Sequence, residues 1–182
     1  MPHIHTEPGQ HDHTASVYLF RTDFDEPKVV LHRHKKFNKY LQFGGHVELH
    51  ETPWQAIIHE LREESGYDIN QIRILQPETR MTKISNSILH PQPVVHSTHP
   101  IGPPVADFEH FHTDIAYAAT TDRDPIHQPE EGESTSIQLF TRDELIALPD
   151  EQIIKNAREI MLHIFDHILP TWQPVEADTF ES

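Results

Sequence analysis

The sequence lacks cysteine, is poor in positive charge and contains no long apolar run. Without cysteine there can be no disulfide, no thiolate metal site and no cysteine nucleophile. The 14 Lys and Arg residues against 29 Asp and Glu give a formal net charge of -15, which would repel a nucleic-acid polymer and an anionic membrane surface. No apolar run approaches the roughly 18–20 residues of a membrane span, and the polar N-terminus has no signal-peptide core. These absences favour a cytoplasmic protein whose partners include neither nucleic-acid polymers nor membranes.

Histidine, in contrast, is abundant, with 17 residues in the chain. Clustered histidines are typical of transition-metal sites. A surface that is rich in histidine for other reasons is the alternative, and the composition favours it. The clusters are His3/His5, His11/His13, His32/His34, His110/His112 and the pair His163/His167, one helical turn apart.

The length of 182 residues fits one domain with a substantial core. We predict an irregular leader at 1–14, the domain at 15–170 and an acidic, frayed C-terminal tail at 171–182. The patterns predict strands at 15–21, 28–35, 39–48, 72–75, 81–85, 110–120 and 136–141, with helices at 52–65, after 141 and from 150 to Pro170. Residues 86–107 carry five prolines and are predicted to be a functional or disordered loop. This order of elements indicates an α/β or α+β fold.

The predicted helix at 52–65 has clear signals at both ends. Thr52 is a suitable N-cap, and Gln55 completes a capping box with it. Gly66 stands where a helix commonly ends in a left-handed residue. At helical spacing, one apolar stripe must face the core, and its members are Trp54, Ile57, Ile58 and Leu61.

Three glutamates of this helix fall close together beside the apolar stripe. Glu60, Glu63 and Glu64 lie within an arc of about 100°, and like charges at this spacing repel one another. Divalent cations relieve such repulsion, and carboxylate oxygens select Mg²⁺, Mn²⁺ or Ca²⁺ over softer metals. Periodicity alone leaves two interpretations open, a metal site and a solvated acidic face.

The segment from Gly45 to Tyr67 reads Gly45, five residues, Glu51, seven residues and then HELREESGY. It resembles the Nudix box, whose pattern is G-x5-E-x7-R-E-U-x-E-E-x-G-U, with U a bulky apolar residue. Eight of the nine defined positions match when Tyr67 counts as bulky and apolar. The likeness extends over roughly residues 15–165, because the preceding strand and the late SIQLFTRDEL segment also resemble the family.

The resemblance implies an α/β/α sandwich with a mixed β-sheet. It also implies hydrolysis, with Mg²⁺ or Mn²⁺, of a diphosphate linkage in a small nucleotide-like substrate. By position, Glu60, Glu63 and Glu64 would hold the metal together with the carbonyl of Gly44. The ions would neutralise the diphosphate and lower the pKa of an attacking water, and one glutamate would accept the proton.

Family members often carry a further glutamate about six residues before the bulky residue of a late strand. Glu133 precedes Leu139 by six residues, so it is the candidate for this catalytic role, with Glu131 behind it. The alternative is an ordinary acidic loop.

One position departs from the family pattern. The usual arginine, which orients the carboxylates, is replaced by His59. Arginine is permanently charged and donates paired hydrogen bonds, whereas histidine donates two only when it is protonated. Glu51 and His59 are therefore the expected orienting residues, and the replacement leaves three outcomes open: weaker activity, activity that depends on pH, or loss of activity.

A second candidate group lies on the strand at 110–120. His110, His112 and Asp114 alternate along it and so share one face. We predict that they line the substrate pocket; a metal site and a partly exposed strand are the alternatives. The segment 86–107 is the expected place for a specificity loop or a lid, but its residues do not identify a ligand.

Three functions remain from the sequence. A hydrolase of a phosphoanhydride bond is favoured, because all three glutamates of the metal site are retained. A catalytically weak binding or regulatory module with the same fold is the first alternative, and a histidine-rich transition-metal protein is the second. A homodimer stays open.

Overall fold

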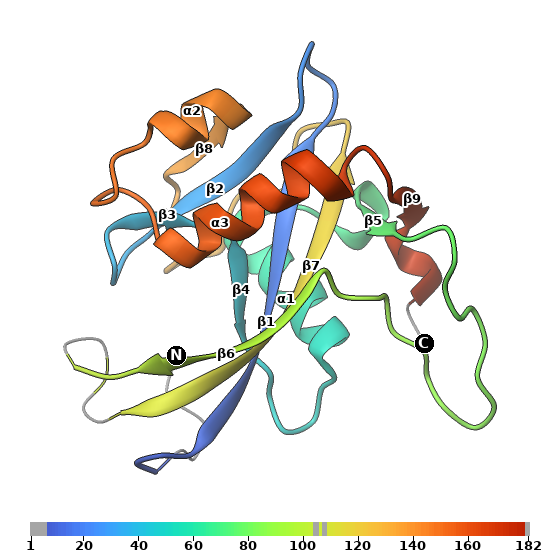
Figure 1. Cartoon of the computed structure of the whole chain (residues 1–182), viewed down its shortest axis with the longest axis horizontal. Coiled ribbons are helices and arrows are strands. Elements are labelled where there is room, and N and C mark those ends of the chain that lie inside the picture. The colour runs from blue at the N-terminus through green and yellow to red at the C-terminus, as the bar shows by residue number, and fades with distance from the viewer. Residues whose placement is uncertain (1–6, 104–105, 107–108, 181–182) are drawn as a thin grey trace.

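The computed structural model describes residues 7–103, 106 and 109–180, and a mixed β-sheet forms its centre (Figure 1). Strands β1 and β7 run parallel to each other, and the other strand pairs are antiparallel. The strands of the described chain are β1 (His11–Arg21), β2 (Lys28–His34), β3 (Lys39–Leu41), β4 (Phe43–His46), β5 (Arg73–Gln76), β6 (Val95–Ile101), β7 (His110–Thr121), β8 (Ile137–Phe140) and β9 (Gln173–Glu176).

The two long central strands each change partners halfway along. One end of β1 pairs with β4 and the other end with β2, while β7 pairs first with β6 and then with β5. The central strands therefore have β4 and β6 as neighbours in the lower part of Figure 1, and β2 and β5 as neighbours in the upper part. The pairing of β4 with the central strand β1 places the Gly44–Gly45 segment near the middle of the molecule.

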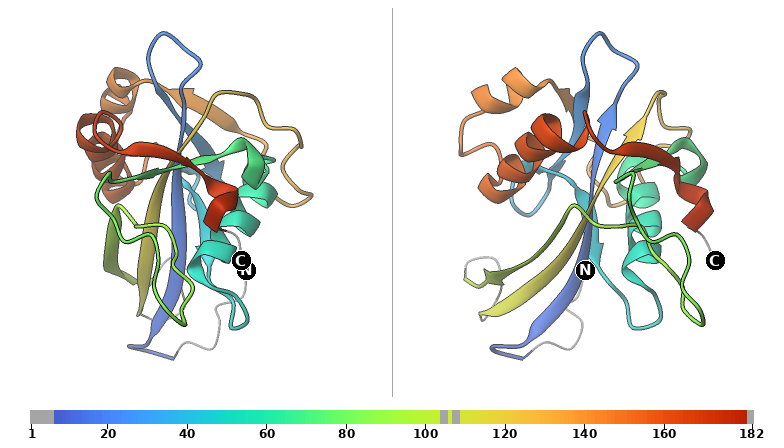
Figure 2. Two further views of the ribbon diagram at one scale, coloured as in Figure 1. Left: turned by 90° about the vertical axis from the view of Figure 1, so that its right-hand side faces the viewer. Right: turned by 45° about the vertical axis from the view of Figure 1, so that its right-hand side comes forward.

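Helices cover both faces of the sheet. Helix α1 (Pro53–Ser65) packs on one face, and α2 (Arg142–Ala147) and α3 (Lys155–His163) lie on the other (Figure 2). A π-helical turn, Ile164–Ile168, continues α3, and short 3₁₀ helices occupy Ile69–Gln71 and Ala177–Phe180. The predicted α/β/α sandwich with a mixed sheet is confirmed.

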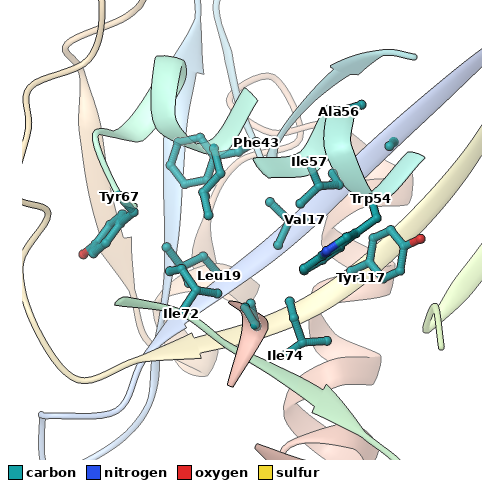
Figure 3. Packing of buried hydrophobic residues seen from close by; sticks show 14 of the residues in the cluster. Val17, Leu19, Phe43, Trp54, Ala56, Ile57, Tyr67, Ile72, Ile74 and Tyr117 are labelled. Carbon is teal, nitrogen blue, oxygen red and sulfur yellow. The ribbon is translucent and has the colours of Figure 1, made fainter. Parts of the chain in front are cut away.

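The two cores follow from the alternation of side chains along β1. Val17 and Leu19 point to the side of α1 and pack with Trp54 and Ile57 (Figure 3), whereas Phe20 points to the side of α3. Because successive residues of a strand face opposite sides, one apolar strand can support both layers. This burial fixes the helical face that carries the glutamates relative to the sheet.

Two local expectations about strands are wrong. Residues 81–85 form no strand, and Met81 and Ile84 are exposed because no neighbouring strand covers them. The predicted loop at 86–107 contains β6, which pairs with β7. Pro100 is tolerated in β6 because this strand lies at the border of the sheet in the described chain, where a missing N–H is harmless.

Two described segments near the ends of the chain form strands that the sequence did not predict. Strand β1 begins at His11, inside the predicted leader. The expectation of a frayed tail is wrong for the residues of β9, which pairs with β5 and is joined to it by a hydrogen bond of 2.9 Å from Arg73 Nε to Glu176 Oε1. The three-part division of the chain remains a prediction, and 1–6 and 181–182 lie outside the described residues. Within the described chain, every helix is too short or too polar to cross a membrane.

Gly66 ends α1 and allows a close approach of another segment. Its φ is +78°, and a Cβ there would stand 2.2 Å from the carbonyl oxygen of His127. We expect Gly66→Ala to lower the free energy of unfolding by about 3 kcal/mol or more, because left-handed strain adds to this clash. Gly132→Ala is the matched control, because φ is +106° there but the space around a Cβ is open. The free energy of unfolding should fall by only about 1–2 kcal/mol in this variant. Urea unfolding measures both, and equal losses would contradict the role of the contact.

Candidate metal and active site

Helix α1 is held at its start by the predicted capping box. The Gln55 backbone N–H donates to Thr52 Oγ1 at 3.3 Å, and the Thr52 N–H donates to the Gln55 side chain at 2.9 Å. At the other end, the Gly66 N–H donates to the carbonyl of Arg62. These local contacts define where the helix begins and ends, so they also define which way its glutamates face.

Two of the glutamates are buried between α1 and the sheet. Glu60 is 2% exposed and Glu64 is 5% exposed. The Gly44 N–H of β4 donates to Glu64 Oε2 at 2.9 Å, which directs this carboxyl at the Gly44–Gly45 segment. His32 of β2, also buried, places its Nδ1 3.7 Å from Glu64 Oε1.

Burial changes the protonation of these carboxyls. It raises the pKa of Glu60 to about 7 and that of Glu64 to about 9, and repulsion from neighbouring carboxylates, including Glu63 and Glu133, adds to the effect. Burial likewise lowers the pKa of His32 to about 4, so its ring is neutral. At neutral pH Glu64 therefore holds a proton, which a divalent cation would displace. Oxygen donors gathered in this way suit Mg²⁺ or Mn²⁺.

The third glutamate of the helix is more exposed and is held by the unusual histidine. The His59 ring donates from Nε2 to Glu63 Oε1 at 2.7 Å, and its Nδ1 lies 3.8 Å from Glu51 Oε2. Glu51 in turn accepts a hydrogen bond of 2.8 Å from the Glu48 N–H. His59 thus forms a hydrogen bond with Glu63 and lies near Glu51, and its orienting role stays a prediction.

The neighbours of His59 favour its charged form. Burial acts to lower the pKa of His59, but the hydrogen bond to Glu63 and the charges of Glu60 and Glu51 outweigh it and raise the pKa. The protonated ring, which can donate from both nitrogens, therefore persists to a higher pH than in an ordinary histidine.

We expect His59→Arg to change how activity depends on pH. As pH rises through the titration of His59, the native protein should lose one charged hydrogen bond, worth about 1 kcal/mol or roughly fivefold in rate for a half-exposed pair. Arginine stays charged, so the ratio of kcat/KM between the variant and the native protein should rise with pH. Other titrating groups cancel in this ratio, and a ratio that is flat from pH 6 to 9 would contradict the role of His59.

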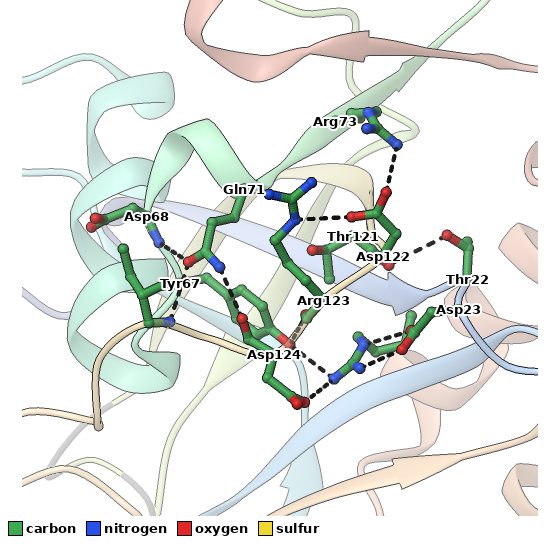
Figure 4. Close-up of polar contacts among 12 residues, drawn as sticks. Thr22, Asp23, Tyr67, Asp68, Gln71, Arg73, Thr121, Asp122, Arg123 and Asp124 are labelled. Atoms are coloured by element: carbon green, nitrogen blue, oxygen red, sulfur yellow. Dashed lines mark hydrogen bonds and ion pairs between the residues drawn. The ribbon is translucent and has the colours of Figure 1, made fainter.

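A polar network fixes the loop that carries Glu133 (Figure 4). Asp124 accepts from Arg21 Nη1 at 2.7 Å, and its carbonyl accepts from Gln71 Nε2 at 2.9 Å. Farther along the loop, the Glu130 N–H donates to the carbonyl of Glu63 at 2.8 Å. The loop is therefore bound to the C-terminal part of α1, and Glu133 comes close enough to raise the pKa of Glu60 and of Glu64.

The residues expected to bind substrate lie elsewhere. Ile115 and Tyr117 of β7 pack in the core on the side of α1, so the alternating positions His110, His112 and Asp114 face the opposite side. Asp114 Oδ1 accepts hydrogen bonds from the hydroxyls of two β1 residues at 2.8 and 2.9 Å. The structure thus separates this group from the glutamates by the thickness of the sheet.

A cavity of about 550 Å³ adjoins the exposed side of α1. His59 and Glu63 line it from the helix, His90 and Ile88 from the proline-rich segment, and Phe180 from the C-terminal 3₁₀ helix. The predicted specificity loop therefore contributes to a cavity that reaches the acidic cluster.

The sequence interpretation missed His32 as a neighbour of Glu64. The signal was the alternation of β2, which puts His32 on the same face as Val30, a residue of the core beneath α1. It also missed Asp12 and His46. Asp12 Oδ2 lies 3.6 Å from His110 Nε2 and 3.7 Å from His46 Nε2.

Comparisons with known proteins agree with this architecture. The chain matches the family model described as NUDIX domain over residues 11–163. It is similar to a solved NUDIX-family hydrolase from Clostridium perfringens, at 29% identity with a TM-score of 0.63, over 85% of this chain and 96% of that chain. A search of curated proteins gave no match.

More distant solved structures share the fold. An Ap4A hydrolase from C. elegans is 16% identical with a TM-score of 0.59, over 87% of this chain and 98% of that chain. The dihydroneopterin triphosphate pyrophosphohydrolase of E. coli is 13% identical with a TM-score of 0.55, over 91% of this chain and 100% of that chain.

Proposed function

Because the chain belongs to the Nudix family, we propose that it is a divalent-metal-dependent hydrolase of a phosphoanhydride bond in a small nucleoside diphosphate derivative. The observation that carries the proposal is the buried carboxyl pair Glu60 and Glu64: Glu64 accepts a hydrogen bond from the Gly44 N–H, and Glu63 and Glu133 are close enough to raise the pKa of both. Two of the structurally similar proteins are named as an Ap4A hydrolase and as a dihydroneopterin triphosphate pyrophosphohydrolase. A diphosphate linkage is common to these molecules.

The residues present fit Mg²⁺ or Mn²⁺. The donors at the site are carboxylate oxygens and the Gly44 backbone, and two of the carboxyls are buried with pKa values raised by burial and mutual repulsion. A dication stabilises the ionised carboxylates that this burial disfavours. We assign Glu60, Glu63, Glu64 and the Gly44 carbonyl as its ligands.

Each residue then has a role in hydrolysis. A bound dication would neutralise the diphosphate and lower the pKa of the attacking water. Glu133, half-buried on its anchored loop, is our candidate to accept the proton of that water. His59 holds Glu63 and stands near Glu51, so it keeps the carboxylates in place between turnovers.

The cavity beside Glu63 is the proposed place for the part of the substrate beyond the diphosphate. Trp54, Ile88 and Phe180 supply apolar wall, and Arg62 supplies a positive charge. Pockets of this kind, apolar with a few polar groups, are suited to a base or another ring. A cytoplasmic location and a homodimer remain predictions.

Product analysis of a substrate panel tests the proposal. The panel contains ADP-ribose, Ap4A and nucleoside triphosphates, each incubated with Mg²⁺, with Mn²⁺ or with EDTA, and products are separated by anion-exchange chromatography. We expect cleavage of at least one compound between two phosphorus atoms, with either metal and not with EDTA. Nucleotide binding without any turnover would favour the regulatory module instead, and turnover in EDTA would contradict the role of the metal.

A further inference from the structure

On the face of the sheet away from α1, the ends of β1, β4 and β7 bring together a second set of side chains that can bind metal. We propose that Asp12, His110 and His112 form a binding site for a divalent transition metal such as Zn²⁺, separate from the glutamates of α1. In Figure 1, these ends of β1 and β7 extend beyond the part of the sheet that α3 crosses.

Strand register explains why the three side chains meet. Asp12 of β1 is the parallel partner of His112 of β7, and His110 lies two residues earlier on β7, on the same face. One ligand atom from each of the three residues lies within 4.8 Å of the others. Their positions are therefore set by backbone pairing within the sheet rather than by a flexible loop.

The distances are close to those of a coordinated metal. His110 Nε2 lies 3.6 Å from Asp12 Oδ2, and metal–ligand bonds of about 2.1 Å in a tetrahedral site separate neighbouring ligand atoms by about 3.4 Å. The rings of His110 and His112 have centroids 5.2 Å apart. Small side-chain shifts would bring all three to a shared ion.

A further histidine approaches the same point from β4. His46 Nε2 lies 3.7 Å from Asp12 Oδ2, and its ring centroid is 5.0 Å from that of His112. Asp12 and His110 are 4% and 1% exposed. His46 is therefore placed to act as a fourth ligand, which would complete the coordination number typical of a structural zinc site.

The chemistry of this set differs from that of the α1 cluster. Imidazole nitrogens with one carboxylate select Zn²⁺ and similar transition metals, whereas oxygen donors alone select Mg²⁺ or Mn²⁺. Asp114, the carboxylate expected from sequence to act with the two histidines, is instead engaged by Thr14 and Ser16. Asp12 takes its place because it is the residue in register with His112.

A metal here would join three strands of the sheet. His46 is two residues from Gly44, so an ion held by His46, Asp12 and β7 would brace the strand that contacts Glu64. Because a ligand that binds only the folded state stabilises it, Zn²⁺ should raise the melting temperature of the native chain.

The test measures Zn²⁺ binding to the full chain without an added histidine tag. Equilibrium dialysis against Zn²⁺ in excess Mg²⁺, followed by metal analysis, should give one tightly bound Zn²⁺ per chain. Asp12→Asn and His112→Ala should each lower the affinity by at least about 100-fold and should abolish the Zn²⁺-dependent rise in melting temperature. Asp12→Asn keeps the shape of the side chain, so it remains informative if His112→Ala does not fold.

Two controls separate this site from others on the chain. His163 and His167 are exposed, with ring centroids 4.9 Å apart, so their double substitution by Ala removes a matched histidine pair and should leave the bound Zn²⁺ in place. Glu60→Gln should leave it in place as well. Unchanged Zn²⁺ affinity in Asp12→Asn and His112→Ala, or loss of the ion in either control, would overturn the proposal.

Discussion

Glu64→Gln should lower metal-dependent turnover by on the order of 10³-fold, within the range lost when an essential catalytic group is removed. Glutamine has the shape of the protonated carboxyl. Its side-chain oxygen can still accept the hydrogen bond that the Gly44 N–H donates to Glu64 at 2.9 Å in the native chain. It cannot ionise, so it cannot offer a metal ion a negative charge. Initial rates with saturating Mg²⁺, on whichever substrate the panel identifies, measure the loss.

This prediction separates chemistry from folding. Because burial already holds the pKa of Glu64 at about 9, the native residue is protonated at pH 7 without metal, and the variant should melt at nearly the same temperature in EDTA. Glu159→Gln, an exposed glutamate of α3, is the matched control and should keep full activity. A Glu64→Gln protein that retains more than about a tenth of the native rate would remove Glu64 from the metal site.

The second large effect concerns stability and pH in the absence of metal. Burial and neighbouring carboxylates raise the pKa of Glu60 to about 7 and of Glu64 to about 9, from ordinary values of 4.5. Between pH 4.5 and 7 the folded state therefore binds more protons than the unfolded state at both groups, and between 7 and 9 at Glu64 alone. The free energy of unfolding must then fall as pH rises, by up to about 1.4 kcal/mol per pH unit for each such group.

The Glu60→Gln/Glu64→Gln double variant isolates this contribution. Other groups, such as His32 with its lowered pKa, titrate in both proteins and cancel in the difference between them. In EDTA, the melting temperature of the variant minus that of the native chain should grow between pH 5 and 9 by at least about 3 °C. Mg²⁺ should make this difference in melting temperature increase less with pH, because it stabilises the ionised carboxylates of the native chain. A difference that is constant with pH would contradict the burial of two protonated carboxyls.

Sequence reasoning located α1 and its glutamates because their signals are local. The capping box of Thr52 and Gln55 and the stop at Gly66 act within one turn of the helix, and the structure contains both. The spacing of the glutamates on one helix also needs no knowledge of the rest of the fold. The roles assigned to Glu60, Glu63 and Glu64 nevertheless remain proposals.

What the sequence did not reveal depends on contacts between distant segments. The parallel pairing of β1 with β7 brings Asp12 beside His112 across a separation of 100 residues, and no local pattern encodes that register. Strand β9 was missed for the same reason, since its partner β5 lies about one hundred residues earlier. His32 next to Glu64 is a third case, because it depends on how α1 packs against β1 and β4.

Anomalous diffraction from crystals soaked in Mn²⁺ tests directly whether the carboxyls of α1 hold the catalytic dication. We expect a Mn²⁺ peak among the side chains of Glu60, Glu63 and Glu64 and the carbonyl of Gly44, and no peak there in crystals of Glu64→Gln. A Mn²⁺ peak only at Asp12, His110 and His112, or an equal peak at the glutamates in Glu64→Gln, would contradict it.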